Sequence, residues 1–359
     1  MTECKHVSFS EEEGIHGFWG IITLNRPEAY NALNHDMIVH IQTQLAQWSQ
    51  NLRLLGVFLH SLFDKAFCAG GDIRTLYEQG KKGDTEALKI FFRDEYRLIH
   101  TIHHYPKPWV SCVHGITMGG GVGISIHGRH RVATETLRFA MPECAIGFFP
   151  DVGGSYFLSR MPGELGVYLG LSGVTISAGD ALYGGLVDHC IAAGTTDALK
   201  AQLLQIDFYK VSDPNEAIAA VLKQQSIMYA PSQLLEHREL IDAYFRGHSV
   251  ENIVRRLQEN NSPWCQTLAH TLLQKSPLSL KVTLEQLRRG RKLNLDTCLE
   301  MEYGLAQHFA RDCDFYEGVR AQIVDKDKQP KWQPETLEAV HSDKVAAYFN
   351  TLYIDKLYS

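Results

Sequence analysis

Residues 115–123 read Gly115-Ile116-Thr117-Met118-Gly119-Gly120-Gly121-Val122-Gly123, shortly after an apolar run from Trp109 to Val113. We interpret the apolar run as a strand and the segment from the triple glycine onward as the start of an apolar helix. Glycines at a helix start leave backbone N–H groups bare, and these groups and the helix dipole stabilise developing negative charge. The stretch therefore predicts a strand–loop–helix unit that can bind an oxyanion.

Two nucleotide-binding motifs compete for this loop. In a dinucleotide fingerprint, Gly121 and Gly123 would be followed by a third Gly or an Ala, but that position holds Ile126. In a P-loop, a Lys-Ser or Lys-Thr pair would follow, and none does. The loop is therefore not a standard nucleotide cradle.

A second glycine motif lies upstream, at Ala66-Phe67-Cys68-Ala69-Gly70-Gly71-Asp72-Ile73. It follows the apolar run Leu55–Ser61 and precedes a helical pattern. Adjacent glycines allow tight backbone geometry and the close approach of a ligand. A plain strand-to-helix turn would explain the same residues, because Gly pairs commonly mark turns.

Two carboxylates, Glu143 and Asp151, lie eight residues apart in an otherwise apolar, Gly- and Pro-rich stretch from Phe139 to Gly154. Burial in such surroundings raises the pKa of a carboxyl group, which suits acid–base chemistry. For Asp151 the alternative is a structural role as the N-cap of a following helix.

The composition limits the class of protein. The 359 residues are 45% hydrophobic, as in soluble globular proteins, and the net charge of -6 disfavours a nucleic-acid binder. The eight cysteines form no Cys-x-x-Cys pair and the 17 histidines no His-Glu-x-x-His motif, so we expect neither a disulfide scaffold nor a metal site. No apolar run reaches the ~18 residues that span a bilayer. The first 20 residues resemble no targeting segment, and we therefore expect a cytoplasmic protein.

Two regions follow from the pattern of apolar residues. Residues 1–208 alternate short strands with helices and read as an α/β domain, whereas residues 209–359 read as a helical region packed on it. The clearest predicted strands are Gly17–Leu24, Leu55–Ser61, Trp109–Val113 and His130–Thr134. The predicted helices are Leu33–Leu52, Glu86–His104, Ala217–Met228, Ser232–Arg246, Val250–Gln258, Pro263–Leu273, Leu278–Arg289 and Asp296–Ala310.

The three motifs, in this order, resemble those of the enoyl-CoA hydratase/isomerase (crotonase) superfamily. Within it, the 3-hydroxyisobutyryl-CoA hydrolase family is the more similar, over nearly the whole chain. The residues that carry the resemblance are Asn25-Arg26-Pro27, Asn31-Ala32-Leu33-Asn34, Phe91–Tyr96, His114–Tyr156, Glu317–Arg320 and Asp325–Asp327.

The resemblance implies a spiral of ββα units followed by a helical region. It implies that the thioester oxygen of an acyl-CoA lies between the N–H groups of Gly71 and Gly120, and that Phe67, Ala69 and Asp72 line the adenine end of CoA. CoA arrives as part of the substrate, so no separate cofactor is implied, and no nucleic acid or membrane partner. A homo-oligomer is compatible with the resemblance. The basic run Arg288–Lys292 reads more simply as a solvated helix end than as a contact to CoA phosphates.

A departure from the hydratase pattern indicates the subclass. Hydratases of the superfamily use two glutamates, and the first of these positions holds Gly123, which leaves Glu143. The pair Glu143 and Asp151 resembles that of the hydrolase family, in which Glu95 also lies near the substrate. The resemblance therefore implies hydrolysis of a short-chain β-hydroxyacyl-CoA, above all 3-hydroxyisobutyryl-CoA in valine catabolism.

Two roles for Glu143 remain open from the sequence: attack on the thioester carbonyl, or activation of a water molecule. Asp151 would orient the substrate hydroxyl or share a proton with Glu143, and Glu95 would bond to the acyl group. Two other functions stay open as well, namely enoyl-CoA hydration or isomerisation, and a non-catalytic binding protein with the crotonase fold.

Overall fold

The computed structural model describes residues 4–228, 232–350 and 355–358. The chain forms two compact units, each assembled from separate stretches of sequence. Unit 1 comprises residues 1–71, 97–139 and 175–235, and unit 2 comprises residues 72–96, 140–174 and 236–359. This division groups residues by compactness and not by element type, so the predicted domains 1–208 and 209–359 stay a prediction.

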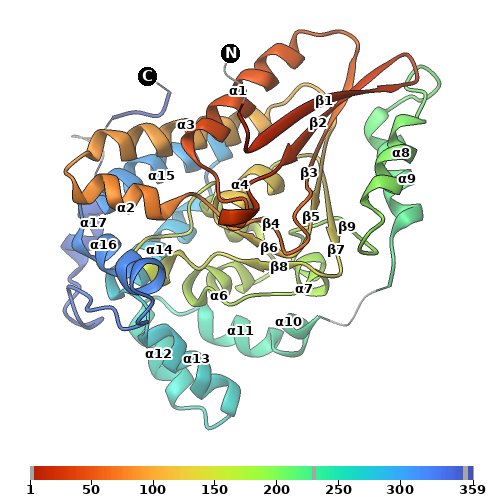
Figure 1. The fold of residues 1–359 in the computed structure, drawn as a ribbon. Coiled ribbons are helices and arrows are strands. Elements are labelled where there is room, and N and C mark those ends of the chain that lie inside the picture. The colour runs from red at the N-terminus through yellow and green to blue at the C-terminus, as the bar shows by residue number, and fades with distance from the viewer. Residues whose placement is uncertain (1–3, 229–231, 351–354, 359) are drawn as a thin grey trace. The chain divides into compact units, whose positions relative to one another are not determined.

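A six-stranded sheet is the frame of unit 1 (Figure 1), with the strand order β1-β2-β3-β5-β7-β9. Strand β1 is antiparallel to β2, and each later pair of neighbours is parallel. Parallel neighbours require crossover connections, which explains why strands and helices alternate in this part of the sequence. The strands are β1 Val7–Gly14, β2 Gly17–Leu24, β3 Leu54–Ser61, β5 Trp109–Val113, β7 His130–Thr134 and β9 His189–Ile191.

The core of unit 1 lies between this sheet and two helices, α8 (Thr196–Leu204) and α9 (Pro214–Gln225), which flank it in Figure 1. Apolar side chains of five neighbouring strands pack against apolar positions of both helices, and all are buried. The residues are Trp19, Ile21, Phe58, Val110, Cys112, Val132, Ile191, Leu199, Leu203, Ile206, Ile218 and Leu222.

A second, three-stranded sheet has the order β4-β6-β8, from strands β4 (Ala66–Cys68), β6 (Ile116–Met118) and β8 (Arg138–Ala140). Strands β4 and β6 are parallel neighbours. Because each glycine motif follows one of these two strands, their pairing brings the two motifs to the same edge of the sheet.

The helices occupy most of the remaining chain. Unit 1 also contains η1 (Pro27–Ala29), α1 (His35–Ser49), α4 (Gly120–Ile126) and α7 (Ala178–Tyr183). Helices α3 (Thr85–His103) and α10 (Gln233–Glu236) cross from one unit into the other. Unit 2 contains α2 Ile73–Lys81, η2 Glu143–Ile146, α5 Gly154–Phe157, η3 Leu158–Arg160, α6 Leu165–Ser172, α11 Arg238–Phe245, α12 Val250–Gln258, α13 Pro263–Leu273, α14 Pro277–Gly290, α15 Leu295–Phe309, α16 Cys313–Val319, η4 Arg320–Val324 and α17 Ser342–Tyr348.

Five aromatic side chains form the centre of unit 2: Phe92, Phe148, Phe149, Phe309 and Phe315. The rings of Phe92 and Phe148 stack with centroids 5.3 Å apart, and those of Phe148 and Phe149 are 4.5 Å apart. All five are buried. This cluster is a rigid support, since Phe148 and Phe149 belong to the loop between Glu143 and Asp151.

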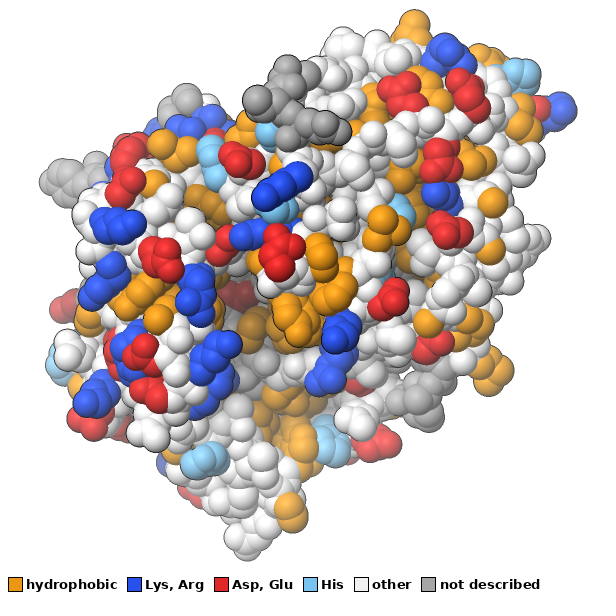
Figure 2. Space-filling view, viewed as in Figure 1, with side chains coloured by type: hydrophobic (Ala, Val, Ile, Leu, Met, Phe, Trp, Pro, Cys, Tyr) orange, Lys and Arg blue, Asp and Glu red, His pale blue; other side chains and the backbone are white. Residues whose placement is uncertain are grey.

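The predicted α/β class with a helical C-terminal region is confirmed. One predicted helix is wrong, because Ser232–Arg246 is broken at His237 into α10 and α11. The eight cysteines, all of them in the described part of the chain, form no disulfide. In the part of the chain that the structure describes, no helix has the length and hydropathy needed to cross a bilayer. On the face drawn in Figure 2, basic and acidic side chains are interspersed without a large field of one sign.

Candidate active site

The two glycine motifs lie against each other in unit 1. A Cβ atom placed on Gly70 would be 3.4 Å from the carbonyl oxygen of Met118 and 3.7 Å from the nitrogen of Gly120. Gly70 has a φ of +116° and Gly119 a φ of +46°, conformations that side chains rarely adopt. The positive φ favours glycine at both positions, and a Cβ atom on Gly121 would lie 2.4 Å from the carbonyl oxygen of Cys68, so the second motif packs closely against the first.

The same loops present backbone donors. Gly120 is the first residue of α4, and the first N–H groups of a helix find no partner within the helix. Gly71 pairs with Leu33 in an isolated bridge, in which the N–H of Leu33 donates to the carbonyl of Gly70. Asn31 anchors β4 from the N-terminal motif, because its Nδ2 donates to the carbonyls of Ala66 and Phe67.

Asp151 lies in unit 2, buried, in the loop before α5. The hydroxyl of Tyr96 on α3 donates to its Oδ2 at 2.7 Å. Burial raises the pKa of Asp151 to about 7, although the Tyr96 bond opposes the shift by stabilising the carboxylate. Asp151 is not a helix N-cap: α5 is capped by Gly153 without any side-chain bond, so the structural alternative for this residue is wrong.

Glu143 begins the 3-10 helix η2, which ends at Gly147 with a φ of +68°. Its side chain is 6% exposed, and its Oε2 has no hydrogen-bond partner among the described residues. Burial, and secondly the charge of Asp151, hold the pKa of Glu143 well above its ordinary value. Such an unpartnered buried oxygen is costly for the fold and available to a ligand.

Glu95 precedes Tyr96 on α3 and is equally buried, at 2% exposure. Its Oε1 also lacks a hydrogen-bond partner within the described part of the chain. Its pKa is raised well above the ordinary value by burial and by the charge of Asp151. Because the charge of Asp151 acts on both Glu95 and Glu143, these three carboxyl groups of unit 2 lie near one another, and we call them the carboxyl cluster. Their roles in a reaction stay a prediction.

This carboxyl cluster can hold one negative charge more easily than two. Asp151 has the Tyr96 hydroxyl to stabilise its ionised form, whereas Oε1 of Glu95 and Oε2 of Glu143 have no hydrogen-bond partner among the described residues. Ionisation is therefore more favourable at Asp151 than at its two neighbours, whose pKa values burial holds well above their ordinary range. A protonated carboxyl next to an ionised one is an arrangement suited to acid–base catalysis.

The structure also gives positions to the three residues predicted to line the adenine end of CoA. Phe67 is fully buried in β4, and its N–H donates to the carbonyl of His114. Ala69 is half-buried and its N–H donates to Tyr30. Asp72 caps α2 by accepting the N–H of Thr75 at 3.2 Å. Their role in binding CoA stays a prediction.

Sequence reasoning missed two residues that hold Asp151 or its loop in place. Tyr96 stood in a quoted motif but had no role assigned, since its bond to Asp151 joins residues 55 apart in sequence. Glu302 on α15 is fully buried and accepts the N–H groups of Gly153 and Ser155. A signal for Glu302 was present, because it stands on the apolar stripe of its helix among Cys298, Leu299, Leu305 and Phe309.

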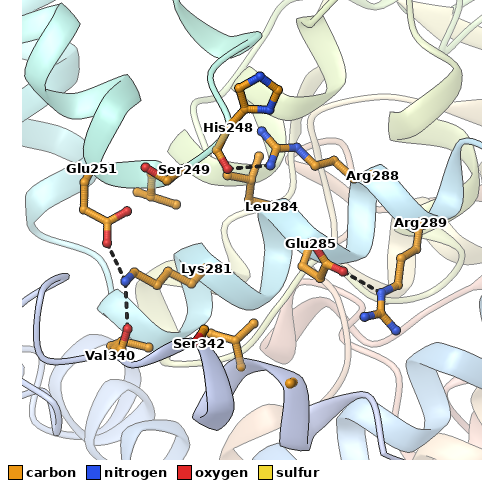
Figure 3. Close-up of a pocket in the computed structure, with 13 residues that line it drawn as sticks. His248, Ser249, Glu251, Lys281, Leu284, Glu285, Arg288, Arg289, Val340 and Ser342 are labelled. Carbon is orange, nitrogen blue, oxygen red and sulfur yellow. Dashed lines mark hydrogen bonds and ion pairs between the residues drawn. The ribbon is translucent and has the colours of Figure 1, made fainter.

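A separate pocket of about 330 Å³ lies in unit 2, between α12, α14 and α17 (Figure 3). Its charged side chains are already engaged: Lys281 pairs with Glu251, Arg289 pairs with Glu285, and Arg288 donates to the backbone of His248. Arg288 and Arg289 thus make contacts within the protein, as the interpretation of the run 288–292 as a helix end expects.

Comparisons with known proteins agree with the motifs. A family model for enoyl-CoA hydratase/isomerase matches residues 19–349. Two curated relatives carry the name 3-hydroxyisobutyryl-CoA hydrolase, mitochondrial. The Danio rerio protein is 43% identical over 93% of this chain and 87% of the relative, and the Gallus gallus protein is 42% identical over 98% and 92%. The chain belongs to the 3-hydroxyisobutyryl-CoA hydrolase family of this superfamily.

A solved structure supports the fold assignment. The crystal structure of a carnitinyl-CoA dehydratase from Mycobacterium thermoresistibile matches with a TM-score of 0.90 and 37% identity, over 99% of this chain and 98% of that one. The predicted crotonase-like fold is therefore confirmed. The different activity in the name of that protein shows that the fold alone does not decide between reactions.

The predicted cytoplasmic location is wrong, because the curated relatives of this family are named as mitochondrial proteins. The prediction rested on the composition of the first 20 residues, on the scattered cysteines and on the absence of a long apolar run. That composition does not determine where the folded enzyme works.

Proposed function

We propose that the protein hydrolyses 3-hydroxyisobutyryl-CoA to 3-hydroxyisobutyrate and CoA, as a step of valine catabolism. The observation that carries the proposal is the buried cluster of Glu95, Glu143 and Asp151, together with glycine at position 123. A hydratase of this superfamily would need a second glutamate at that position. The proposal includes no metal and no cofactor besides the CoA of the substrate, and no nucleic acid or membrane partner.

We assign the proposed roles from the chemistry of the residues in each of the two units. The N–H groups of Gly71 and Gly120 would stabilise the oxyanion that forms on the thioester, and loss of one such donor typically costs about 3 kcal/mol of barrier. Glu143 would either attack the carbonyl carbon or remove a proton from the attacking water. Asp151, which ionises near neutral pH, would take the proton of Glu143 and so make either role available. Glu95 would bond to the acyl group.

The balance of the reaction is simple. Water supplies a hydroxyl to the acyl carbon, the carbon–sulfur bond breaks, and CoA leaves as a thiolate that is protonated afterwards. Thiols ionise at a pKa of about 8.5, so the leaving group needs little help from an acid. The protein's main tasks are therefore to activate the nucleophile and to stabilise the oxyanion.

A panel of acyl-CoA thioesters tests the function. The expected result is release of free thiol, fastest with 3-hydroxyisobutyryl-CoA. The relationship to a carnitinyl-CoA dehydratase favours one alternative, addition or removal of water at the acyl chain. A change in enoyl absorbance without thiol release would establish that alternative, and no turnover of any thioester would indicate a non-catalytic relative.

The substitution Glu143→Gln tests the assignment of the catalytic residue. We expect turnover to fall at least ~100-fold, the contribution of a general acid–base group or more. Glu78→Gln, at an exposed position of α2, is the matched control and should retain the wild-type rate. A near wild-type rate for Glu143→Gln would overturn the assignment.

Oxygen-18 water distinguishes the two roles of Glu143. After a single turnover, label in the Glu143 carboxylate would support an acyl-enzyme anhydride. Label in the product acid alone would assign Glu143 as the base that activates water.

A further inference from the structure

The loop that carries Asp151 has a backbone that its surroundings must hold in place. Val152 has a φ of +53° and Gly153 a φ of +84°. For a β-branched residue such as Val152, the left-handed region is a true outlier. Residues of this kind persist only where neighbouring groups constrain them, and they concentrate at functional sites.

Glu302 on α15 supplies the constraint. Its Oε2 accepts the N–H of Gly153 at 2.7 Å, and its Oε1 accepts the N–H of Ser155 at 2.8 Å. Gly153 follows Val152 directly and Ser155 lies three residues after it, so the carboxylate fixes the chain where it leaves the left-handed turn. Gln286 on α14 holds the other side, because its Nε2 donates to the carbonyl of Pro150 at 2.6 Å and to Ser155 Oγ at 2.8 Å.

These contacts need a carboxylate in particular. A glutamine offers one acceptor oxygen, and its NH₂ group would face the second backbone N–H as donor against donor. An apolar side chain would leave both buried N–H groups without a partner. Burial of Glu302 is itself unfavourable and raises the pKa of this residue to about 8, whereas the two backbone donors favour its ionised form. The carboxylate with two acceptor oxygens therefore predominates above pH 8, which is the range in which the test below is made. The presence of a buried glutamate at position 302 is therefore better explained by its role in fixing the loop than by a gain in stability.

The loop geometry in turn determines where Asp151 points. Asp151 directly precedes Val152, and its carbonyl accepts the N–H of Gly154 at 2.7 Å. Its carboxylate reaches the hydroxyl of Tyr96 on α3, and its charge acts on both Glu143 and Glu95. A shift of the loop would separate these groups.

We propose that Glu302 is a positioning residue, which fixes the Asp151 loop so that the Asp151 carboxylate stays in the cluster with Tyr96 and Glu143. Glu302 acts through Asp151 and does not touch the reacting atoms. The proposal rests on the proposed function, in which Asp151 takes part in thioester hydrolysis.

A double-mutant cycle on the full-length protein tests the proposal. Thiol release from 3-hydroxyisobutyryl-CoA is measured above pH 8 for the wild type, Glu302→Gln, Asp151→Asn and the double variant. For Glu302→Gln we expect kcat to fall about 10- to 100-fold with KM changed less than about threefold, the cost of displacing a catalytic group by about 1 Å. In the Asp151→Asn background the same substitution should change kcat less than about twofold, because the residue through which it acts is already disabled.

Controls separate positioning from a general loss of structure. Glu300→Gln removes a carboxylate from the same helix, where Glu300 accepts the N–H of Leu357, and should leave kcat unchanged. If Glu302→Gln does not fold, Glu302→Asp takes its place in the cycle, since it keeps both acceptor oxygens one methylene further back. It should lower kcat in the wild-type background only.

Equal losses of kcat in both backgrounds would overturn the proposal, as would an unchanged kcat for Glu302→Gln. Failure of the proposed function looks different, because the wild type would then release no thiol at all. In that case the cycle is run with whichever acyl-CoA reaction the wild type does catalyse.

Discussion

Asp151→Asn should stabilise the folded protein while it lowers activity. The asparagine side chain has nearly the shape of aspartate and cannot ionise. Its amide oxygen can still accept the hydroxyl of Tyr96, which donates to Asp151 in the wild type. The substitution therefore removes a buried charge and keeps the packing around it.

The size of the effect follows from the pKa of Asp151, which burial raises from 3.8 to about 7. Such a change corresponds to a cost of about 4 kcal/mol for the ionised group in the folded state, at 1.36 kcal/mol for each pH unit. The new amide NH₂ group has no assigned acceptor, and leaving it unsatisfied costs about 1–3 kcal/mol. The expected net gain in the free energy of unfolding at pH 8 is about 1–3 kcal/mol.

The difference in stability between Asp151→Asn and the wild type depends on pH. Because the folded state holds the Asp151 proton more tightly than the unfolded chain, the wild type loses stability as the pH rises from about 4 to about 7. At pH 4 the carboxyl group is neutral in the folded protein, and the variant has no advantage from charge removal. The advantage should appear and grow between these two values.

Urea unfolding at several pH values between 4 and 8 measures the effect, with thiol release recorded on the same preparations. Asp64→Asn, at an exposed position of unit 1, serves as the control and should change the free energy of unfolding by less than about 0.5 kcal/mol at every pH. A stability difference that is the same at pH 4 and pH 8 would refute the electrostatic reasoning. Retained activity in Asp151→Asn would refute the catalytic role.

Two other substitutions follow from the site. Tyr96→Phe removes the donor that favours ionised Asp151. The ascending limb of the pH–rate profile should therefore move upward by about one to two pH units, since a bond to a charged group contributes about 1.5–3 kcal/mol. An unmoved limb would show that the ionisation of Asp151 does not control the rate. Gly147→Ala would place a Cβ 2.1 Å from the carbonyl oxygen of Asp314 at a φ of +68°. We therefore expect the free energy of unfolding, measured with urea, to fall by at least about 2 kcal/mol, and Glu143 to be displaced. Wild-type stability would contradict the tight packing.

Local patterns predicted the elements well where neighbours in sequence decide the structure. The strands Gly17–Leu24, Trp109–Val113 and His130–Thr134, and the helices Val250–Gln258 and Pro263–Leu273, have the predicted bounds. The alternation of strand and helix was sufficient for the α/β class. Periodicity and apolar runs depend on neighbours in sequence, which is why they report element type and bounds.

The break at His237 could not be predicted in the same way. Ser232 Oγ and the N–H of Leu234 both donate to Asp180, which lies about 50 residues earlier in the chain. This tertiary contact fixes the start of α10, and α11 begins anew after His237. A continuous apolar stripe gives no sign of such a contact.

The site was predictable to the extent that glycine and carboxylate motifs are local. The glycine pair and the triple glycine indicated close backbone approach, and the structure places Gly70 against Gly120. Tyr96 and Glu302 were missed because their bonds join distant segments, although a carboxylate on the apolar stripe of α15 was a visible anomaly. Their positions depend on tertiary packing that no motif describes.

Burial of the carboxyl groups of unit 2 lowers the stability of the fold, and we attribute their presence to the reaction. Glu95, Glu143, Asp151 and Glu302 are all buried, and within the described residues none of them forms an ion pair with a lysine or arginine. A structural carboxylate is normally paired or fully hydrogen-bonded, yet Glu95 and Glu143 each leave an oxygen without a partner. Asp151, bonded to Tyr96, has a pKa raised to about 7, and burial holds the pKa values of Glu95 and Glu143 well above their ordinary range. In the proposed hydrolysis, this arrangement would supply one charge and an adjacent exchangeable proton for activation of the nucleophile against the thioester.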